Sequence, residues 1–396
     1  MTRSRNLLTE VGLLSISLVL TSAYVISVSL PAMEKQFTAV SQSSIELLAT
    51  LPAFSVMIMV LLSGFIAEKI GHKNTTALGL VIAGTAGIVP ALSNSFTVIF
   101  VSRLFLGVGL GMFNSLAVSM IGFLYRDKQK ANLMGFRSAF ENLGQSFLLF
   151  VASYLISISW HATFWVYAFA FPIALVFYLL VPEPVNPASA KAQADGKRPK
   201  QHINLKVFGL AVFFFFLVMI HIAIIVHLPF IITGLSYGTA AQAGVITGSM
   251  NILGLLAAMG YGQIYRVLSR WILPLGLAIL AVGVLGIAFS RSFIVTLISA
   301  WVFGIVYPMI AAHMFNNVST VASPNSETLT ASVLLVGTNS GALLSPYGIK
   351  LLAVITGDTI GAKTFLLLGS ILVIAAVVAF LIAAQRRTRH QPAGQN

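Results

Sequence analysis

A carboxylate and two arginines lie inside long apolar stretches of this 396-residue chain: Glu141, Arg137 and Arg103. Glu141 and Arg137 are four residues apart, so on a helix they share one face and can form an ion pair. An ionised side chain at membrane depth costs roughly 2.5 to 3.5 kcal/mol and therefore usually serves a function. The chemistry available here is proton exchange at Glu141, with Arg137 and Arg103 controlling its pKa. A permanent ion pair that braces two helices is the alternative.

Other polar residues also fall within the apolar stretches, and we predict that they line a cavity around Glu141. These candidates are Tyr24, Asn114, Asn142, Gln145, His221, Asn251, His313 and Asn339. A single histidine inside a membrane bonds to a neighbouring helix more often than it binds a ligand. Helix contacts are therefore the competing interpretation for the histidines.

The elements that must position these residues are membrane-crossing helices. Hydrophobic residues make up 58% of the chain and charged residues 8%, against about 25% charged in soluble domains. A bilayer core about 30 Å thick requires roughly 20 apolar residues per helical crossing. We predict an all-α integral membrane protein with twelve transmembrane helices, at about 7–30, 44–66, 75–93, 97–124, 131–157, 163–181, 207–232, 242–264, 272–289, 293–315, 329–355 and 364–384.

The distribution of charge predicts the orientation. Lysine and arginine in short loops favour the cytoplasmic side, and one set of alternating loops holds most of them. That set includes Arg3, Arg5, Lys69, Lys73, Arg126, Lys128, Lys130, Arg266, Arg270 and Arg386. The opposite loops hold Lys35, Arg291 and Lys363, with Glu34, Glu46 and Asp358. We therefore predict a protein of the cell membrane with both termini in the cytoplasm.

The formal net charge of +13 follows from the same loops. We interpret it as a topology signal with attraction to the lipid bilayer, and we expect no nucleic-acid partner. The chain has no cysteine, which excludes disulfides and thiolate metal sites. We expect no cofactor and no metal, and a monomer.

The chain resembles itself when shifted by 197 residues. Ser93–Gly107 then aligns with Ser290–Gly304, while Asn142 and Gly144 align with Asn339 and Gly341, and Lys69 and Lys73 with Arg266 and Arg270. One constant shift in three separate places indicates a duplicated six-helix unit. We predict an N-terminal bundle at 1–181, a cytoplasmic linker at 182–206 and a C-terminal bundle at 207–396 that ends in a short basic tail. Parallel repeats of this kind place the binding site between the halves.

The segment GFIAEKIGHK resembles the loop 2-3 signature of the major facilitator superfamily. The matching positions are Gly64, Glu68, Lys69, Gly71, His72 and Lys73, with Glu68 in place of the usual aspartate and His72 in place of a basic residue. A second family signature, in the fourth helix, matches Arg103, Gly107 and Gly109. The resemblance implies two pseudo-symmetric six-helix bundles. It also implies that Arg103 takes part in proton transfer, as its counterpart does in the antiporters of the family.

Physical chemistry suggests a role for the same turn. Gly64 and Gly71 permit close helix approach and a tight reversal. Glu68 can accept hydrogen bonds from a helix N-terminus or from a basic partner. We predict that this turn is a gating latch, whereas the alternative is that Lys69, His72 and Lys73 only set the topology. The shift of 197 places Tyr265 at the position of the acid, so the latch is expected in one half only.

Together these features predict a secondary transporter that works by alternating access. The resemblance to the drug-exporting branch favours proton-coupled export of lipophilic or cationic small molecules. The alternative is proton-coupled uptake or facilitated transport of a sugar, organic acid or other metabolite, bound by Arg103, Arg137 and the buried asparagines. A receptor or scaffold without transport is a further possibility. We expect no enzyme, because the GLSYG string at Gly234–Gly238 lacks the strand-turn-helix context of a nucleophile elbow.

Overall fold

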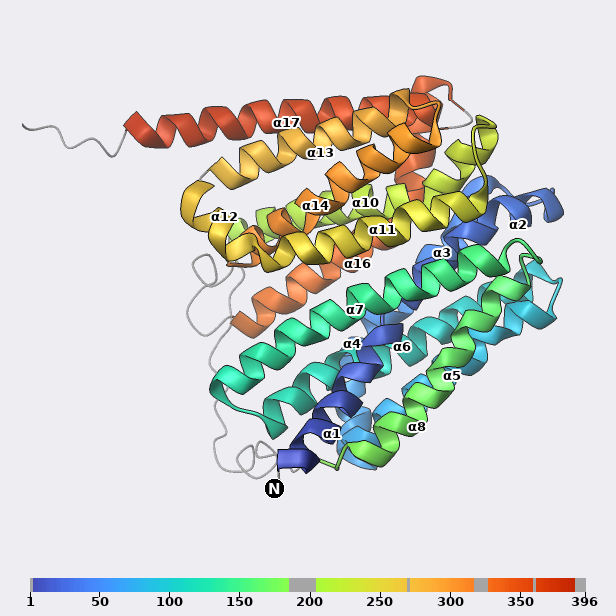
Figure 1. Ribbon diagram of the computed structural model, residues 1–396, viewed down its shortest axis with the longest axis vertical. Coiled ribbons are helices and arrows are strands. Elements are labelled where there is room, and N and C mark those ends of the chain that lie inside the picture. The colour runs from blue at the N-terminus through green and yellow to red at the C-terminus, as the bar shows by residue number, and fades with distance from the viewer. Residues whose placement is uncertain (1–2, 185–203, 269–270, 317–326, 359–360, 389–396) are drawn as a thin grey trace, which may run out of the picture.

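A computed structural model describes residues 3–184, 204–268, 271–316, 327–358 and 361–388, and their regular structure is entirely helical. Most of the predicted linker at 182–206 and the end of the basic tail lie outside the described residues. The helices form twelve long segments that follow the predicted crossings (Figure 1). The all-α fold predicted from the apolar stretches is therefore confirmed.

The first six segments run from the N-terminus to residue 180. They are α1 (Arg3–Ser15) continued by 3₁₀ turns at Ile16–Val19 and Ser22–Ser29 and by α2 (Leu30–Gln36); α3 (Gln42–Thr50) with α4 (Pro52–Ile70); α5 (His72–Ile88) with a 3₁₀ turn at Val89–Leu92; α6 (Phe96–Leu124); α7 (Asp127–Leu155); and a 3₁₀ segment at Ala162–Phe169 with α8 (Ala170–Leu180).

The other six segments begin after the linker. They are α10 (Leu205–Gly234); α11 (Ala240–Met259) with the short α12 (Tyr261–Leu268); α13 (Ile272–Phe289); α14 (Phe293–Asn316); α16 (Glu327–Thr356); and α17 (Ala362–Thr388).

Two of the twelve segments are more polar than the rest. Within the described residues, ten segments are long and apolar enough to cross a membrane. The remaining two, α7 and α16, have 29 and 30 residues and so have the length to cross as well. Both carry amide and hydroxyl side chains along their length, and the shift of 197 places one on the other. Helices of this kind are suited to line a polar interior, since lipid disfavours their side chains.

The helices form two groups, which lie one above the other in Figure 1. Helices α1 to α8 make the lower group and α10 to α17 the upper one, and α1 begins and α17 ends at the left. We call the end of the molecule that holds the start of α1, the turn between α4 and α5 and the end of α17 the basic end. We call the other side, where α2 and α3 lie, the opposite end. The groups touch through α7 against α11 and through α3 and α4 against α16.

Glycine contacts keep the same register in the two groups. A Cβ atom on Gly144 would lie 2.1 Å from the carbonyl oxygen of Leu18, and one on Gly341 would lie 2.2 Å from that of Phe215. Adding 197 to the numbers of Gly144 and Leu18 gives the numbers of Gly341 and Phe215. At each place only glycine lets the two helices approach this closely. These contacts support the proposal of a duplicated unit with bundles at 1–181 and 207–396.

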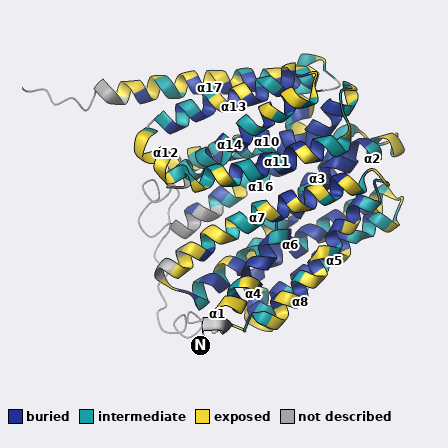
Figure 2. Cartoon of the chain, in the orientation of Figure 1, coloured by how far each residue is buried: buried dark blue, intermediate teal, exposed yellow. Residues whose placement is uncertain are grey.

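Apolar side chains cover the outer faces of both groups. Figure 2 shows exposed residues along α5, α8 and α17, with buried residues between the helices. Leu179 on α8 is 70% exposed and Ile374 on α17 is 64% exposed. Such faces are suited to contact with lipid rather than water.

Candidate functional site

Glu141 lies halfway along α7, as the fifteenth of its 29 residues. Its Oε2 atom is 3.7 Å from Nη1 of Arg137, and the two side chains are 26% and 14% exposed. This distance fits an ion pair but is too long for a hydrogen bond. Nη2 of Arg137 donates to Oδ1 of Asn114 on α6 at 2.8 Å. Arg137 is therefore held in place by Asn114, which leaves the carboxylate of Glu141 open to a further partner.

Aromatic residues from both groups form a cluster that reaches Glu141 through Tyr24. Tyr24, in the first crossing, lies within electrostatic range of Glu141 and of Tyr307 on α14. The ring of His221 on α10 stacks on Tyr307 at a centroid distance of 4.0 Å and an angle of 8°. The Nδ1 atom of His221 is buried and has no hydrogen-bond partner among the described residues. The structure thus joins three predicted residues with one that we did not predict.

Sequence reasoning missed Tyr307 because a tyrosine in an apolar helix resembles ordinary packing. One signal was available. Tyr307 directly precedes Pro308, a proline inside α14. A proline in a helix interior removes a backbone hydrogen bond, and such positions in membrane proteins often border cavities.

The predicted amides divide into two kinds. Asn142 donates to the carbonyl oxygen of Ser138, and Asn339 donates to that of Leu335, each four residues back and each at 2.9 Å. These two side chains are satisfied within their own helices. Asn251 on α11 is buried, and its Nδ2 atom has no partner among the described residues. Gln145 on α7 is buried as well. Asn251 is therefore the amide best suited to bind a ligand.

His313, which we expected to line the cavity, lies close to one end of its helix. It lies three residues before the end of α14, at the basic end. Its Nδ1 atom is 3.4 Å from the hydroxyl of Tyr261, and its ring is 5.9 Å from that of Tyr265. His313 is twenty residues after Phe293, where α14 begins, and these residues span about 30 Å of helix. His313 is thus separated from the cluster around Glu141.

Arg103 is fully buried within the first group of helices. Its Nε atom donates to the carbonyl oxygen of Leu48 at 3.0 Å, and its Nη2 atom donates to the carbonyl oxygen of Ala23 at 3.0 Å. Nη2 also donates to the hydroxyl of Tyr167 at 2.8 Å, and this hydroxyl donates to the carbonyl oxygen of Ser22 at 2.9 Å. Among these described contacts none is with Glu141. Arg103 therefore joins the first, second and sixth crossings.

The glycines that follow Arg103 bring α6 close to its neighbours. A Cβ atom on Gly107 would lie 2.3 Å from the carbonyl oxygen of Pro52 on α4, and one on Gly109 would lie 2.5 Å from that of Gly79 on α5. The helix-four signature therefore acts in packing.

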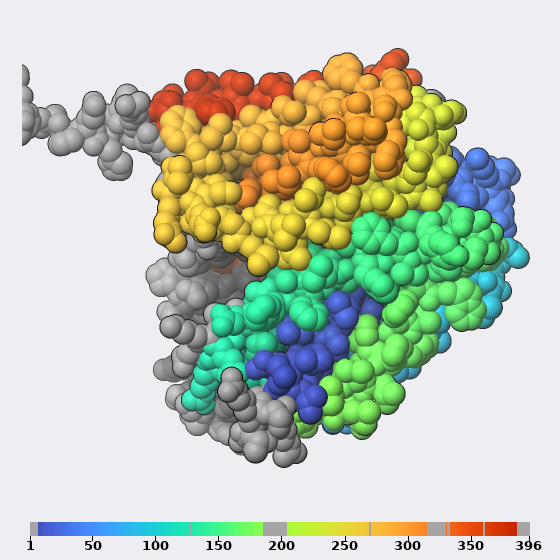
Figure 3. Space-filling view, in the orientation of Figure 1, coloured from blue at the N-terminus to red at the C-terminus, as the bar shows by residue number. Residues whose placement is uncertain are grey.

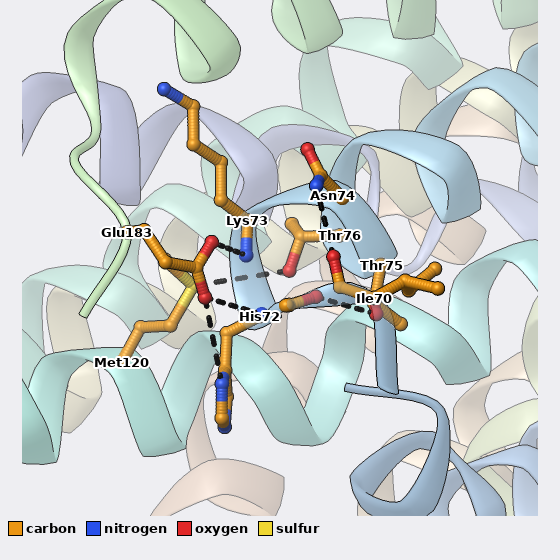
Figure 4. Close-up of polar contacts among 9 residues, drawn as sticks. Ile70, His72, Lys73, Asn74, Thr75, Thr76, Met120 and Glu183 are labelled. Carbon is orange, nitrogen blue, oxygen red and sulfur yellow. Dashed lines mark hydrogen bonds and ion pairs between the residues drawn. The ribbon is translucent and has the colours of Figure 1, made fainter. Parts of the chain in front are cut away.

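The turn between α4 and α5 contains one contact that we did not predict (Figure 4). Gly71 has φ +92°, a backbone conformation that favours glycine. The carboxylate of Glu183 accepts hydrogen bonds from the backbone N–H groups of His72 at 2.6 Å and Lys73 at 2.9 Å. Its Oε1 atom is also 3.8 Å from Nδ1 of His72. Glu183 therefore places a negative charge at the N-terminus of α5, where the helix dipole favours it.

Two expectations for this turn need correction. Glu68 is exposed at the end of α4, and Glu183 contacts the helix N-terminus, which was one of the two partners that we considered for Glu68. A Cβ atom on Gly64 would meet nothing within 4 Å, so close helix approach does not require glycine there in this conformation. Sequence reasoning missed Glu183 because it is 111 residues from His72. Its position between Pro182 and Pro184, at a helix end, was the available signal.

Replacing Glu183 with alanine is expected to loosen the first turn of α5. The change removes two hydrogen bonds and the favourable charge, worth about 1 kcal/mol at a half-exposed site. Hydrogen exchange at the amides of His72 and Lys73 should become several-fold faster. The matched control is Glu68→Ala, which removes an exposed carboxylate and should leave these amides unchanged. Equal exchange in both variants would contradict the assignment of Glu183.

Known proteins resemble this chain in sequence. A family model described as Major Facilitator Superfamily matches residues 12–346. Quinolone resistance protein NorA of Staphylococcus aureus is 25% identical over 170 residues, which cover 42% of this chain and 43% of that protein. The match thus spans less than half the length of the relative.

Solved structures resemble the whole fold. A bacterial homologue of the human lysosomal transporter Spinster, in an inward-facing and unoccupied conformation, has a TM-score of 0.75 at 15% identity, over 100% of both chains. A D-xylose–proton symporter has a TM-score of 0.70 at 17% identity, over 94% of this chain and 96% of that chain. Identities this low establish the fold alone.

Proposed function

Because this chain belongs to the major facilitator superfamily, whose model matches residues 12–346, we propose that it exports lipophilic or cationic small molecules in exchange for protons. Family membership makes it a secondary transporter of the membrane and not an enzyme. The observation that carries the finer proposal is the position of Glu141. It is a partly exposed carboxylate at the midpoint of α7, within electrostatic range of Tyr24, which in turn is within range of Tyr307 in the other half.

Glu141 can bind either a proton or an organic cation, but not both. When ionised, its carboxylate attracts a cation, and the faces of Tyr24 and Tyr307 add cation–π attraction. When protonated, it loses this attraction and also its ion pair with Arg137. Since one carboxylate serves both ligands, binding of one releases the other. Such competition couples the exit of substrate to the entry of protons.

Alternating access requires each end of the protein to open in turn. Near the opposite end the halves are tightly packed, since a Cβ atom on Gly244 of α11 would lie 2.0 Å from Oγ of Ser153 on α7. Figure 3 shows α7 and α11 in contact across the two halves. With the predicted orientation, we propose that this conformation opens to the cytoplasm, because the halves are packed together at the opposite end.

The end of α4 is exposed, so its side chains can form new contacts when the basic end closes. Glu68, Lys69 and Gly64 are exposed in the present conformation. We propose that they contact the second half in the other conformation, as a latch. Glu68→Ala should then shift the balance toward opening at the basic end. Labelling of cysteines introduced near each end measures this shift, and unchanged labelling would contradict the latch.

The similarity to NorA supports a drug-like substrate, because that protein is named for quinolone resistance. The alternative is uptake of a sugar, organic acid or other metabolite. The hydrogen bond between Arg137 and Asn114, together with the unpaired amide of Asn251, would suit such a ligand. The two proposals differ in the chemistry of the molecules that should bind.

A panel of ligands, tested for stabilisation against heat, distinguishes the two proposals. Ligands that bind the folded state raise the unfolding temperature, and we expect aromatic cations to do so while sugars and organic acids do not. Tyr307→Ala should weaken cation binding about 5- to 30-fold, because a desolvated cation–π contact is worth about 1 to 2 kcal/mol. Tyr347→Ala is the matched control, since Tyr347 is exposed on α16. Stabilisation by sugars or acids alone would favour uptake.

A further inference from the structure

A buried pair of titratable residues joins the two halves near the opposite end. Oε1 of Glu46 on α3 lies 2.6 Å from Nδ1 of His227 on α10, and the two side chains are only 3% and 5% exposed. Nε2 of Gln42 donates to the same oxygen at 3.0 Å. We expected Glu46 in a loop, but α3 begins at Gln42, and Glu46 is thus one turn inside a helix.

The surroundings hold this pair firmly and connect it to one end of the protein. Gly361, with φ +99°, leaves room for the imidazole, because a Cβ atom there would lie 2.2 Å from Nε2 of His227. The ring of Phe365 stacks on the imidazole at 6.1 Å and 19°. A pocket of about 410 Å³ borders both members of the pair and also Lys350 and Asp358. The pair therefore lies beside a space that can hold water.

The number of protons on the pair follows from geometry and burial. A ring nitrogen and a carboxylate oxygen at 2.6 Å must have a proton between them, because two lone pairs would repel. A neutral imidazole that donates from Nδ1 would leave a buried negative charge, which is expensive, so we expect the pair to hold one further proton and to be neutral as a whole. A neutral pair is either a carboxylate with an imidazolium or a carboxylic acid with an imidazole. Both forms hold one proton more than a separated carboxylate and neutral imidazole.

From this count we infer that Glu46 and His227 form a second proton-binding site, which takes up one proton when the opposite end closes and releases it when that end opens. The inference rests on the alternating access of the family, but it does not depend on coupling at Glu141. Separation of the halves would expose both groups to water. There an imidazole is mostly neutral above pH ~6.5 and a glutamate is ionised above pH ~4.3.

Among the residues that the structure describes, no other charged group near the pair neutralises Glu46 in place of this proton. The charged residues around it are Glu34 and Lys35 of α2, Lys350 of α16, Asp358 before α17 and Lys363 of α17. Lys35, Lys350 and Lys363 are exposed, while Glu34 and Asp358 are partly exposed, so water screens them. Within the described chain, no lysine or arginine forms an ion pair with Glu46. The imidazole is thus the group that neutralises Glu46.

The pH dependence has a defined sign. Above pH ~6.5 the closed end holds one proton more than the open end, so acidification favours closure by up to tenfold per pH unit. Between pH ~6.5 and ~4.3 both states hold the same number of protons, and the ratio should level off. Below pH ~4.3 the open state binds the additional proton, and acid should favour opening.

Distances between two spin labels across the opposite end test this inference. The chain has no cysteine, so Ala39→Cys and Ser236→Cys, in the turns after α2 and α10, can be labelled without further changes. In lipid nanodiscs, the ratio of short to long distances should rise by up to tenfold per unit from pH 8.5 to 6.5 and then level off. A flat profile for this labelled protein, with both members of the pair intact, would overturn the inference.

Variants identify the groups responsible. Glu46→Gln and His227→Gln should each make the ratio independent of pH in this range, whereas Glu34→Gln, the matched control, should keep the dependence. Glu141→Gln should also keep it, even if it abolishes coupled transport. A dependence that survives both Glu46→Gln and His227→Gln, or that disappears only with Glu141→Gln, would refute this site without affecting the proposed export.

Discussion

Replacing Glu141 with glutamine is expected to abolish transport driven by a pH gradient, while exchange of substrate at saturating concentration continues. Glutamine keeps the size of the side chain and its hydrogen-bonding capacity, but it cannot gain or lose a proton. The protein should still alternate between conformations, since Glu141 is not part of the described contacts that close the opposite end. The affinity for a cation should fall, because the ionised partner is lost.

Proteoliposomes provide the measurement. Uptake of a cationic substrate with an imposed pH gradient should fall to the level of empty vesicles, whereas counterflow without a gradient should persist. Glu34→Gln is the matched control, because it removes a partly exposed carboxylate outside the cluster. If gradient-driven transport by Glu141→Gln equals that of the wild type, the coupling residue lies elsewhere.

Replacing Arg103 with alanine is expected to destabilise the first half by about 3 kcal/mol or more. The change leaves a cavity at a fully buried position. It also removes the donors to the carbonyl oxygens of Leu48 and Ala23 and to the hydroxyl of Tyr167. Each unsatisfied buried group costs about 1 to 3 kcal/mol. Arg103→Lys should recover only part of the stability, since an ammonium lacks the planar shape that reaches several acceptors.

Thermal unfolding in detergent measures this effect. Tyr167→Phe should show a smaller loss of about 1 kcal/mol, because it removes one hydroxyl from the same cluster. Lys350→Ala serves as the control, since its side chain is exposed. If Arg103→Ala unfolds at the wild-type temperature but loses gradient-driven transport, then Arg103 acts in proton coupling, as the family resemblance implies.

Much of the fold could be predicted because its causes are local in the sequence. Hydropathy over about 20 residues identifies a crossing, and the twelve predicted stretches correspond to the twelve helical segments. The shift of 197 residues also predicted equivalent positions, and the contacts of Gly144 and Gly341 keep that register. The ion pair of Arg137 and Glu141 was predictable for the same reason, since helical spacing places them on one face.

The contacts of the site were less predictable, because position along a helix does not specify the direction of a side chain. Arg103 and Glu141 both lie within the membrane, yet Arg103 turns into the first bundle, toward Tyr167. Glu183 and Glu68 are both acidic residues at helix ends, and only the packing of α8 against α5 selects Glu183 for the contact with His72. Both cases depend on how whole helices are oriented.

The sequence by itself determined that this chain is a twelve-helix membrane transporter of the major facilitator superfamily, because length, hydropathy and a short signature record these properties directly. Only the tertiary structure decided which polar residues meet. Glu46 and His227 belong to different halves and are 181 residues apart, and His72 and Glu183 are 111 residues apart. Such pairs form through the packing of helices, and nothing in the sequence near either residue specifies the partner.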